Sequence, residues 1–502
     1  MKSNILELLE ETAARVPLRR AFYDDHEALS FASLMERSRR IGSSLAAVTR
    51  PRQVVALLLD ARSIRNLPAI FGVLYAGCAY APLDIAMPSQ RLHQLLTLMQ
   101  PAAILADDKG GKALAACPAI QARVLMEQEA SQAPADDKRL TEIRAQSGPF
   151  DPASVLYTSG STGVPKGSVQ THWSYLHWTR ATIEVYGLTE EIVFGNQSPF
   201  FYANSLLEIY PPVALGATVY LLPAGVLAFP RKMLQCLQEQ RVTLLCMTPS
   251  SFAGVTRSDA LTPGCLKTLR WGIMSGEPMP WQVLQVWMQA APGASWWHFY
   301  GSTEMLSVAV GKVDGLNRSE GRLPVGQPFE AVRLVFLDEN GKPAPAGEPA
   351  ELFVSSPWIA LGYYRDEQRT AAAWVEDPLG EGWHERFYRA GDIGYRMEDG
   401  QLMVLGRRDL QIKHMGYRME LGEVEIALGR VMGVEESCVL YQKEQDRIWC
   451  FYSGSLAENQ LRQALREKLA RYMLPDVLVR LDELPHTSSM KIDRMRLKAR
   501  MQ

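Results

Sequence analysis

The sequence has no run of about 18 consecutive apolar residues, and its first twenty residues carry acids where a secretory signal peptide needs an apolar core. We therefore expect no membrane span and a cytoplasmic location. The sequence also has almost no net charge, because 53 Lys and Arg are balanced by 55 Asp and Glu. Binding nucleic acid or anionic lipid over a whole surface needs an excess of positive charge, so we expect neither as a partner.

Cysteine is sparse, and several common motifs are missing. The seven cysteines are spread along the chain, and no two of them form a C-x-x-C pair, so we expect neither disulfides nor a structural zinc site. No G-x-x-x-x-G-K-[ST] loop occurs, and no G-x-G-x-x-G opens a helix. The sequence therefore does not support a Walker-type or Rossmann-type nucleotide site.

The first part of the chain alternates short apolar runs with helical patterns. A length of 502 residues is too great for one hydrophobic core, so two to four packed units are expected. Strands that alternate with helices favour mostly parallel sheets covered on both faces. The runs that predict strands are 54–59, 80–83, 102–106, 122–126, 218–222 and 242–246. Residues 127–148 are polar without a clear period, which predicts a surface connection.

The pattern changes after about residue 330. Short strands joined by turns, at 332–337, 351–354 and 400–405, predict an antiparallel, barrel-like region. From about residue 410 strands and helices mix again. We therefore predict an α/β fold with a large N-terminal domain of stacked, mostly parallel sheets plus the barrel-like part, over residues 1–408. A small α+β domain follows over residues 409–502.

The most informative segment is Y-T-S-G-S-T-G-V-P-K-G at residues 157–167. Its three glycines allow close backbone approach, and its hydroxyls and lysine can surround phosphate oxygens. The composition alone fits a flexible surface turn equally well. The string as a whole, however, resembles the phosphate loop of the adenylate-forming superfamily, which includes acyl- and aryl-CoA synthetases and the adenylation domains of nonribosomal peptide synthetases.

Four further segments are similar to motifs of that superfamily and occur in the same order along the chain. They are Y-G-S-T-E at 300–304, Y-R-A-G-D at 388–392, G-R-R-D-L-Q-I-K with its continuation at 406–425, and M-K-I-D-R at 490–494. The resemblance covers almost the whole chain. It implies ATP-dependent activation of a carboxylic acid to an acyl-AMP, followed by transfer to a thiol, with ATP and Mg²⁺ as cofactors and AMP as a product.

The resemblance also implies roles for the nucleotide-binding residues. Six residues of the first segment would contact the triphosphate: Thr158, Ser159, Gly160, Ser161, Thr162 and Lys166. Thr303 and Glu304 would lie at the α-phosphate, with Glu304 as the metal ligand. Tyr300 would lie near the adenine, and Asp392 would accept hydrogen bonds from the ribose with support from Arg407. These residue types suit the neutralisation of phosphate charge and the recognition of hydroxyls.

A mobile C-terminal domain is implied as well. Lys491 would be catalytic, because one positive charge between carboxylate and phosphate stabilises the charge that develops there. Asp409 would be the hinge. Rotation at the hinge would remove Lys491 and bring Lys413 and Gly416 toward the second half-reaction, since two reactions share one site.

The segment at 198–211 departs from the amino-acid-activating pattern. Those relatives carry F-D-x-S, whose Asp pairs with the substrate ammonium, whereas this chain has Ala203 at the position of that Asp. A buried ammonium without a counter-charge costs several kcal/mol. The segment looks like that of benzoate-CoA ligases, which implies a flat slot for an aromatic acid. The residues expected to line it are Tyr202, Ala203, Asn204, Leu207, Ser275, Phe299 and Ser307.

Other parts of the chain are similar to free-standing ligases that load carrier proteins, with D-alanine–carrier protein ligase the most similar. The segments concerned are 247–252, 323–326, 411–413 and 416–420. We therefore expect an aryl or similar amine-free acid to be passed to the phosphopantetheine thiol of a separate carrier protein, as in nonribosomal peptide or polyketide biosynthesis. An amino acid as substrate, CoA as acceptor, and a binding protein without turnover are the alternatives.

Overall fold

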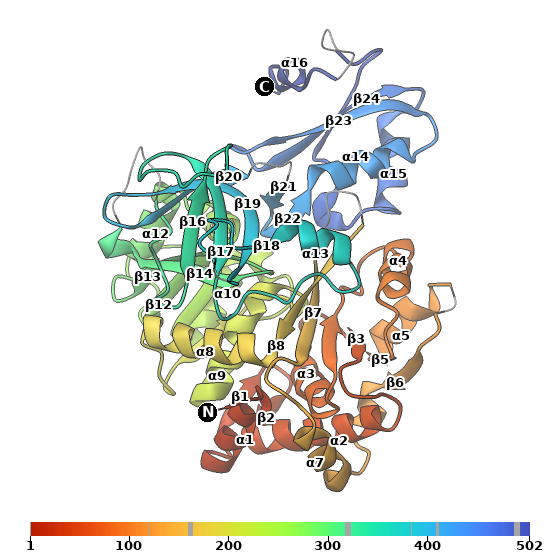
Figure 1. Ribbon diagram of the computed structural model, residues 1–502, viewed down its shortest axis with the longest axis vertical. Coiled ribbons are helices and arrows are strands. Elements are labelled where there is room, and N and C mark those ends of the chain that lie inside the picture. Colours follow the sequence, from red (N-terminus) through yellow and green to blue (C-terminus); the bar gives the residue numbers. More distant parts are fainter. Residues whose placement is uncertain are drawn as a thin grey trace.

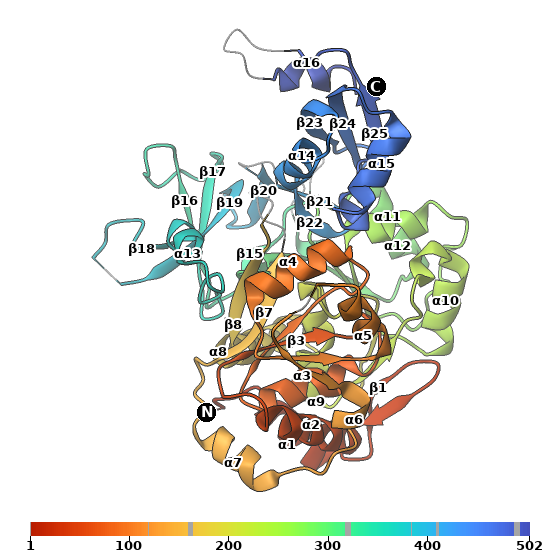
Figure 2. The ribbon, with the colours of Figure 1, turned by 90° about the vertical axis from the view of Figure 1, so that its right-hand side faces the viewer.

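The computed structural model describes residues 2–118, 120–158, 164–316, 323–382, 384–407, 411–485 and 492–501. A large body extends to residue 407, and a smaller unit that starts at residue 411 covers one end of it (Figures 1 and 2). The predicted α/β class, with a large N-terminal domain and a small C-terminal domain, is confirmed. The boundary between residues 408 and 409 falls outside the described residues and stays a prediction.

The larger sheet of the body has nine strands in the order β15-β14-β13-β12-β11-β9-β10-β1-β2. Strands β13, β12, β11, β9, β10 and β1 are parallel to one another, and antiparallel strands form both edges. The bounds are β1 (Arg20–Tyr23), β2 (Ala28–Ser30), β9 (Val193–Asn196), β10 (Thr218–Leu221), β11 (Leu244–Met247), β12 (Trp271–Ser275), β13 (Ser295–Ser302), β14 (Leu306–Lys312) and β15 (Gln327–Pro328).

The second sheet has six strands in the order β6-β5-β3-β4-β7-β8. They are β3 (Val54–Leu58), β4 (Ala79–Pro82), β5 (Ala103–Ala106), β6 (Arg123–Met126), β7 (Pro152–Thr158) and β8 (Lys166–Thr171). All neighbours are parallel except β7 and β8, which form an antiparallel hairpin with Thr158 opposite Lys166. The sheet register therefore brings together the two ends of the glycine-rich segment.

Helices lie between the two sheets and over their outer faces (Figure 1). One hydrophobic cluster joins both sheets through α1 (Leu6–Arg15), α2 (Phe31–Ala46), α3 (Asn66–Tyr75), α8 (His172–Tyr186) and α9 (Tyr210–Leu215). A second lies between the larger sheet and α10 (Pro230–Glu239), α11 (Pro249–Thr256) and α12 (Trp281–Ala290). A third packs α4 (Ser89–Met99) and α5 (Asp108–Ala115) on the smaller sheet. No described helix is both long enough and apolar enough to cross a membrane.

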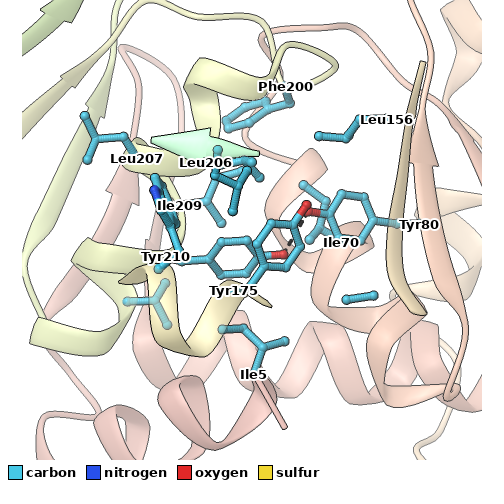
Figure 3. Close-up of a cluster of buried hydrophobic side chains, with 14 of the residues drawn as sticks. Ile5, Ile70, Tyr80, Leu156, Tyr175, Phe200, Leu206, Leu207, Ile209 and Tyr210 are labelled. Atoms are coloured by element: carbon cyan, nitrogen blue, oxygen red, sulfur yellow. Dashed lines mark hydrogen bonds between the residues drawn. The ribbon is translucent and has the colours of Figure 1, made fainter. Parts of the chain in front are cut away.

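Three buried tyrosines join two helices to the smaller sheet within the first cluster (Figure 3). The hydroxyls of Tyr80 and Tyr210 lie 2.8 Å apart, and the Tyr175 hydroxyl lies 2.5 Å from Ser154 Oγ. The Tyr175 and Tyr210 rings pack with their centroids 4.7 Å apart. A hydroxyl removed from water must find a partner, so these pairs satisfy one another and tie α8 and α9 to strands β4 and β7 of the smaller sheet.

The antiparallel strands predicted after residue 330 form a five-stranded sheet at the side of the body (Figure 2). Its strands are β16 (Arg333–Leu337), β17 (Ala350–Ser355), β18 (Trp374–Glu376), β19 (Arg386–Arg396) and β20 (Leu402–Arg407), with α13 (Glu367–Ala373) before β18. Strands β19 and β20 pair so that Asp392 lies opposite Arg407.

The C-terminal domain has its own core. A hairpin of β21 (Gln411–His414) and β22 (Tyr417–Glu420) leads into α14 (Leu421–Gly429). A three-stranded sheet follows, formed by β23 (Val434–Gln442), β24 (Arg447–Gly454) and β25 (Val477–Arg480), with α15 (Glu458–Arg466), the short helix η4 (Arg471–Met473) and α16 (Arg494–Lys498). Two hydrophobic clusters of this domain contain residues from 412 onward alone.

The surface connection predicted for residues 127–148 is wrong in one respect, because it contains α6 (Glu127–Ala130) and α7 (Asp137–Ala145). The side chain of Asp136 caps α7 by accepting a hydrogen bond from the Arg139 amide. Only Leu140 and Ile143 of α7 are buried. Two apolar residues one turn apart are too few to establish a helical period in the sequence.

Candidate active site

A cavity lies where strands of both sheets of the body meet the C-terminal domain. All seven residues predicted for the acid slot belong to its lining: Tyr202, Ala203, Asn204, Leu207, Ser275, Phe299 and Ser307. The short helix η1 (Ala203–Glu208) positions three of them, and β12, β13 and β14 supply Ser275, Phe299 and Ser307. We call the part of the cavity bounded by these seven residues the acid pocket.

The walls of the acid pocket are apolar and aromatic, with neutral polar groups between them. Asn204 Nδ2 donates to Ser275 Oγ at 3.2 Å. Trp178, on α8, also lines the cavity, and its Nε1 donates to Ser307 Oγ at 3.2 Å. Sequence reasoning missed Trp178, because α8 carries no family motif and a buried tryptophan is an ordinary core residue.

A second part of the cavity lies between the two domains, and we call it the interdomain arm. Asp84, Met87 and Leu95 line it from the body, and Tyr417 and Tyr472 line it from the C-terminal domain. The rings of these two tyrosines stack with their centroids 4.1 Å apart. Asp84 is the one carboxylate among the described lining residues, and burial raises its pKa.

The predicted phosphate-binding residues that the structure describes lie together. Thr158 ends β7 and lines the cavity, and Lys166 begins β8. The Lys166 Nζ lies 3.5 Å from Glu304 Oε1, and Gln170 donates to the Thr303 carbonyl at 3.1 Å. Thr158 Oγ1 is buried without a hydrogen-bond partner among the described residues, as expected of a group whose partner is a bound ligand.

Lys166 is buried next to another cation. Burial lowers its pKa, Arg418 lowers it further, and together they outweigh the carboxylate of Glu304, so that the pKa is about 8. Burial also lowers the pKa of Lys413 to about 8. Both lysines are therefore positively charged at neutral pH and lose that charge in mildly alkaline solution.

We expect kcat/KM for ATP to fall as the pH rises above about 8, because the neutral Lys166 no longer attracts the triphosphate. kcat/KM reports the ionisation of the free enzyme. Lys166→Arg should remove this alkaline limb, since a guanidinium stays protonated. Lys413→Arg is the matched variant. If the alkaline limb persisted in Lys166→Arg and disappeared in Lys413→Arg, the limb would belong to Lys413 and not to Lys166.

The predicted nucleoside residues form one hydrogen-bonded group. The Tyr300 hydroxyl donates to Asp392, and Arg407 Nη1 lies 3.3 Å from Asp392 Oδ1. Arg407 also donates to the Ala390 carbonyl at 2.7 Å, which fixes its guanidinium beside the carboxylate. The pairing of β19 with β20 and the end of β13 thus bring together three residues that are up to 107 positions apart in the sequence.

The β21–β22 hairpin of the C-terminal domain inserts into the site and places Lys413 in the cavity lining. The peptide of Gly416, at the tip, is bound from both sides. Its N–H donates to Glu277 Oε1 at 3.0 Å, and its carbonyl accepts from the Tyr202 hydroxyl. Gly416 has φ of 81° beside Thr248, so a larger residue would be strained and would press against that side chain.

Arg418, on β22, forms an ion pair with Glu304 that is buried on both sides. Arg418 Nε also donates to Gln411 Oε1 at 2.6 Å, and the Tyr363 hydroxyl donates to Glu304 Oε1 at 2.9 Å. Burial alone would raise the pKa of Glu304, but Arg418 and Lys166 outweigh it and hold the pKa well below its usual value. Arg418 lies within the motif at 406–425, but the sequence predicted no role for it.

Glu304 in this arrangement does not fit a divalent cation. One carboxylate oxygen accepts from Arg418, and the other accepts from Tyr363 and lies near Lys166. A divalent cation bound to this carboxylate would lie beside Arg418 and Lys166, which already balance its charge, and would be repelled by both. No group of three or more acidic, histidine or cysteine side chains that could hold a metal occurs among the described residues.

A second ion pair joins the two domains beside the interdomain arm. Arg91 of α4 pairs with Glu423 of α14, and the two side chains are 9% and 3% exposed. Burial raises the pKa of Glu423 more than Arg91 lowers it. The residues therefore depend on each other, because either one alone would be a buried, uncompensated charge.

Several predicted site residues fall outside the described residues: Ser159, Gly160, Ser161, Thr162, Asp409 and Lys491. Their roles stay predictions. The described helix that follows Lys491 in sequence, α16, lies at the far end of the C-terminal domain from the body (Figure 1). Arg494, which begins α16, donates to the Val439 carbonyl at 3.0 Å and pairs with Glu425.

Two family models match the chain. The model described as "AMP-binding enzyme" matches residues 9–364, and the one described as "AMP-binding enzyme C-terminal domain" matches residues 423–491. Surfactin synthase subunit 1 of Bacillus subtilis is 30% identical over 502 residues, which are 98% of this chain and 14% of that protein. The chain thus spans a small part of the length of this curated relative.

Solved structures share the fold, and the three described next do so at identities of 20% to 22%. The adenylation domain AlmE of Vibrio cholerae, in complex with glycyl-adenosine-5'-phosphate, has a TM-score of 0.85 and 20% identity, with 100% of this chain and 98% of that chain covered. NpsA-ThdA of Klebsiella oxytoca, an artificially fused adenylation-PCP di-domain, has a TM-score of 0.82 and 22% identity, with 96% and 94% covered. NpsA in complex with 3-hydroxyanthranilyl-AMSN has a TM-score of 0.69 and 22% identity, with both chains covered fully.

Proposed function

The chain belongs to the AMP-binding enzyme family, and from this premise we propose that it activates an aromatic carboxylic acid and transfers it to the thiol of a carrier protein. The family is adenylate-forming and uses ATP. In the proposed first step a carboxylate oxygen bonds to the α-phosphorus of ATP and expels pyrophosphate, which gives the acyl-AMP. In the second step a thiol sulfur attacks the acyl carbon, loses its proton to solvent or a nearby base, and expels AMP.

The single observation that carries the choice of acid is the charge of the acid pocket. No carboxylate lies among its described residues, and Ala203 occupies the position from which amino-acid-activating relatives contact an ammonium. The polar groups that are present, Asn204, Ser275 and Ser307, are neutral. A flat ring with hydrogen-bonding substituents fits such walls, whereas a buried ammonium would lack a counter-charge.

The domain orientation supports the thiol-transfer half of the proposal. Lys413, Gly416 and Arg418 of the C-terminal hairpin face the site, and the interdomain arm extends the acid pocket outward between the domains. A passage of this kind, lined by apolar and aromatic side chains together with Asp84 and Arg91, suits the slender arm that carries a phosphopantetheine thiol. We propose that Asp409 is the hinge. Rotation of the C-terminal domain at this residue would replace the described domain arrangement by one in which Lys491 takes part in acyl-AMP formation.

The carrier protein is proposed as the acceptor because the chain matches one section of a long synthase and shares its fold with an adenylation-PCP di-domain. NpsA, which is solved in complex with 3-hydroxyanthranilyl-AMSN, supports an aromatic acid for a protein of this fold. AlmE, which is solved in complex with glycyl-adenosine-5'-phosphate, supports the second candidate, an amino acid, for which Asp84 is the carboxylate in the described cavity lining. CoA remains the alternative acceptor.

Pyrophosphate exchange with a panel of acids tests the proposed substrate. We expect exchange with hydroxy- or aminobenzoates and little with glycine, alanine or proline. Ala203→Asp should abolish most of the aryl-dependent exchange, because an unpaired buried carboxylate costs several kcal/mol. Ala203→Asn adds a side chain of the same size without the charge, so it should retain more exchange than Ala203→Asp.

Strong exchange with one α-amino acid and none with benzoates would contradict the aromatic assignment. In that case Asp84→Asn should abolish the amino-acid-dependent exchange, because Asp84 would be the counter-charge of the ammonium. An equal loss of exchange in Ala203→Asp and Ala203→Asn would show that size, and not charge, matters at position 203.

A further inference from the structure

Two tryptophans hold Ser307 of β14, one at its hydroxyl and one at its carbonyl. Trp178 Nε1 donates to the hydroxyl oxygen at 3.2 Å, and Trp358 Nε1 donates to the carbonyl oxygen at 2.9 Å. All three side chains are buried, and Trp178 and Ser307 both line the cavity. The Ser307 hydroxyl therefore lies between a fixed donor and the space of the acid pocket.

The direction of the hydrogen bond between Trp178 and Ser307 follows from the chemistry of the two groups. An indole nitrogen carries a proton and cannot accept one, so Trp178 can only donate. The Ser307 oxygen is then the acceptor, and its own proton must point elsewhere. No described group accepts a hydrogen bond from this hydroxyl. The acid pocket thus contains a buried donor that lacks an acceptor, which is costly unless a ligand supplies one.

Ser275, the other serine of the acid pocket, is not constrained in the same way. Its oxygen accepts from Asn204 Nδ2 at 3.2 Å. A side-chain amide has a donor and an acceptor on the same carbon, so turning the Asn204 amide over would reverse this bond. Ser275 can therefore donate or accept as the ligand requires, whereas Ser307 has a fixed role.

We infer that Ser307 donates a hydrogen bond to the acid and that Trp178 sets this role, so that the pocket selects an acid with a hydrogen-bond acceptor at the position that reaches Ser307. The inference rests on the proposed function for the use of the pocket, and it deepens that function by naming a property of the acid. A hydroxyl, an ether oxygen or a ring nitrogen can accept the bond. An aromatic amino group accepts poorly, because its lone pair is delocalised into the ring. Trp178 acts through Ser307 and is a positioning residue.

Pairs of acids that differ in one group test the donor role of Ser307. A methoxybenzoate and the ethylbenzoate substituted at the same ring position have similar size, but only the ether oxygen accepts a hydrogen bond, and it cannot donate one. In pyrophosphate exchange, wild-type protein should favour the methoxy acid by about tenfold in kcat/KM at the ring position that reaches Ser307, because the ethyl acid leaves the buried hydroxyl unpaired. Ser307→Ala should lose this preference.

Trp178→Phe tests the positioning role, because it keeps a ring and removes the N–H. The Ser307 hydroxyl can then occupy all three staggered directions, of which one points at the acid, so the methoxy-to-ethyl ratio should fall by roughly threefold. Trp358→Phe is the matched control, since it removes an indole N–H from the carbonyl of the same serine. It should change kcat/KM for both acids by the same factor and leave the ratio as in wild type.

The hydrogen bond between Trp178 and Ser307 can also be observed without any acid. The NMR signal of the Trp178 indole proton is identified by its loss in Trp178→Phe. It should move upfield in Ser307→Ala, because the acceptor oxygen is gone. The corresponding signal of Trp358 should move much less, since its acceptor is the backbone carbonyl that the substitution retains.

Three results would overturn the inference. They are a wild-type protein that does not favour the ether at any ring position, a Trp178→Phe ratio equal to that of Trp358→Phe, and a Trp178 signal that stays in place in Ser307→Ala. If exchange occurs only with α-amino acids, the proposed aromatic acid is wrong, and the same ratio is measured with O-methylserine and norvaline. The acids that support exchange thus test the proposed function, and the ratio within a pair tests the inference.

Discussion

Lys491→Ala is expected to slow acyl-AMP formation by roughly 10²–10³-fold, because removal of one transition-state charge contact costs about 3–4 kcal/mol. Thiol transfer from a supplied acyl-AMP should be nearly unchanged, since the hairpin residues Lys413 and Gly416 face the site in that step. Single-turnover measurements of the two half-reactions, the first by pyrophosphate release and the second by thioester formation, test both statements.

Lys498→Ala is the matched control for this variant. Lys498 is exposed on α16, seven positions after Lys491, and should tolerate the change in both half-reactions. If Lys491→Ala formed acyl-AMP at the wild-type rate, the catalytic charge would have to come from another residue, and the described candidates are Lys166 and Lys413.

Arg91→Leu is expected to give the opposite pattern. It leaves Glu423 buried without its partner when the domains are arranged as described, at a cost of about 3 kcal/mol, which is roughly a hundredfold shift away from this arrangement. Thioester formation should fall by up to that factor, while acyl-AMP formation should stay within about twofold of wild type. Parallel assays of the two half-reactions on the same protein preparation make the comparison.

A double variant separates electrostatics from packing. In Arg91→Leu with Glu423→Leu no buried charge remains, and two apolar side chains can pack in place of the ion pair, so thioester formation should recover at least in part. Arg123→Leu, at an exposed arginine of β6, controls for the loss of a surface charge. Equal losses in both half-reactions of Arg91→Leu would indicate damage to α4 and not a shift between arrangements.

Much of the fold could be predicted because buried parallel strands have a distinctive composition. The runs at 54–59 and 102–106 became β3 and β5, since strands covered on both faces must be apolar throughout. Helix α7 could not be predicted, because it depends on a capping aspartate, on the burial of Leu140 and Ile143, and on polar contacts with the body such as that of Arg139 with the Ala46 carbonyl. Packing against the body stabilises this helix, although its sequence has no helical hydrophobic period.

The grouping of the seven residues expected around the acid followed from the sequence, whereas their role in binding an acid stays a prediction. The seven residues expected around it lie in one cavity, because each occupies a motif or a strand end that the fold brings to the same edge. Trp178 was not predicted, since its contact with Ser307 spans 129 positions and leaves no local signal. Only the fold brings these two side chains together.

The contacts between the two domains were the features that the sequence predicted least well. The Arg418–Glu304 and Arg91–Glu423 pairs join residues 114 and more than 300 positions apart. Acidic and basic residues are usually solvated, and nothing in a single sequence indicates which of many possible pairs is buried. Their burial depends on how one folded unit is seated on another.

Tyr202 illustrates a consequence for protein engineering. Its ring forms a wall of the acid pocket, and its hydroxyl binds the carbonyl of Gly416 in the other domain. Substitutions at position 202 that are chosen to admit new acids would therefore also change the contact with the C-terminal domain, and with it the rate of the proposed transfer to the thiol. Screens that detect activation alone would enrich variants that fail in the transfer step. Altered selectivity is therefore better sought at Leu207 or Ser307, since neither side chain forms a hydrogen bond or ion pair with the described part of the C-terminal domain.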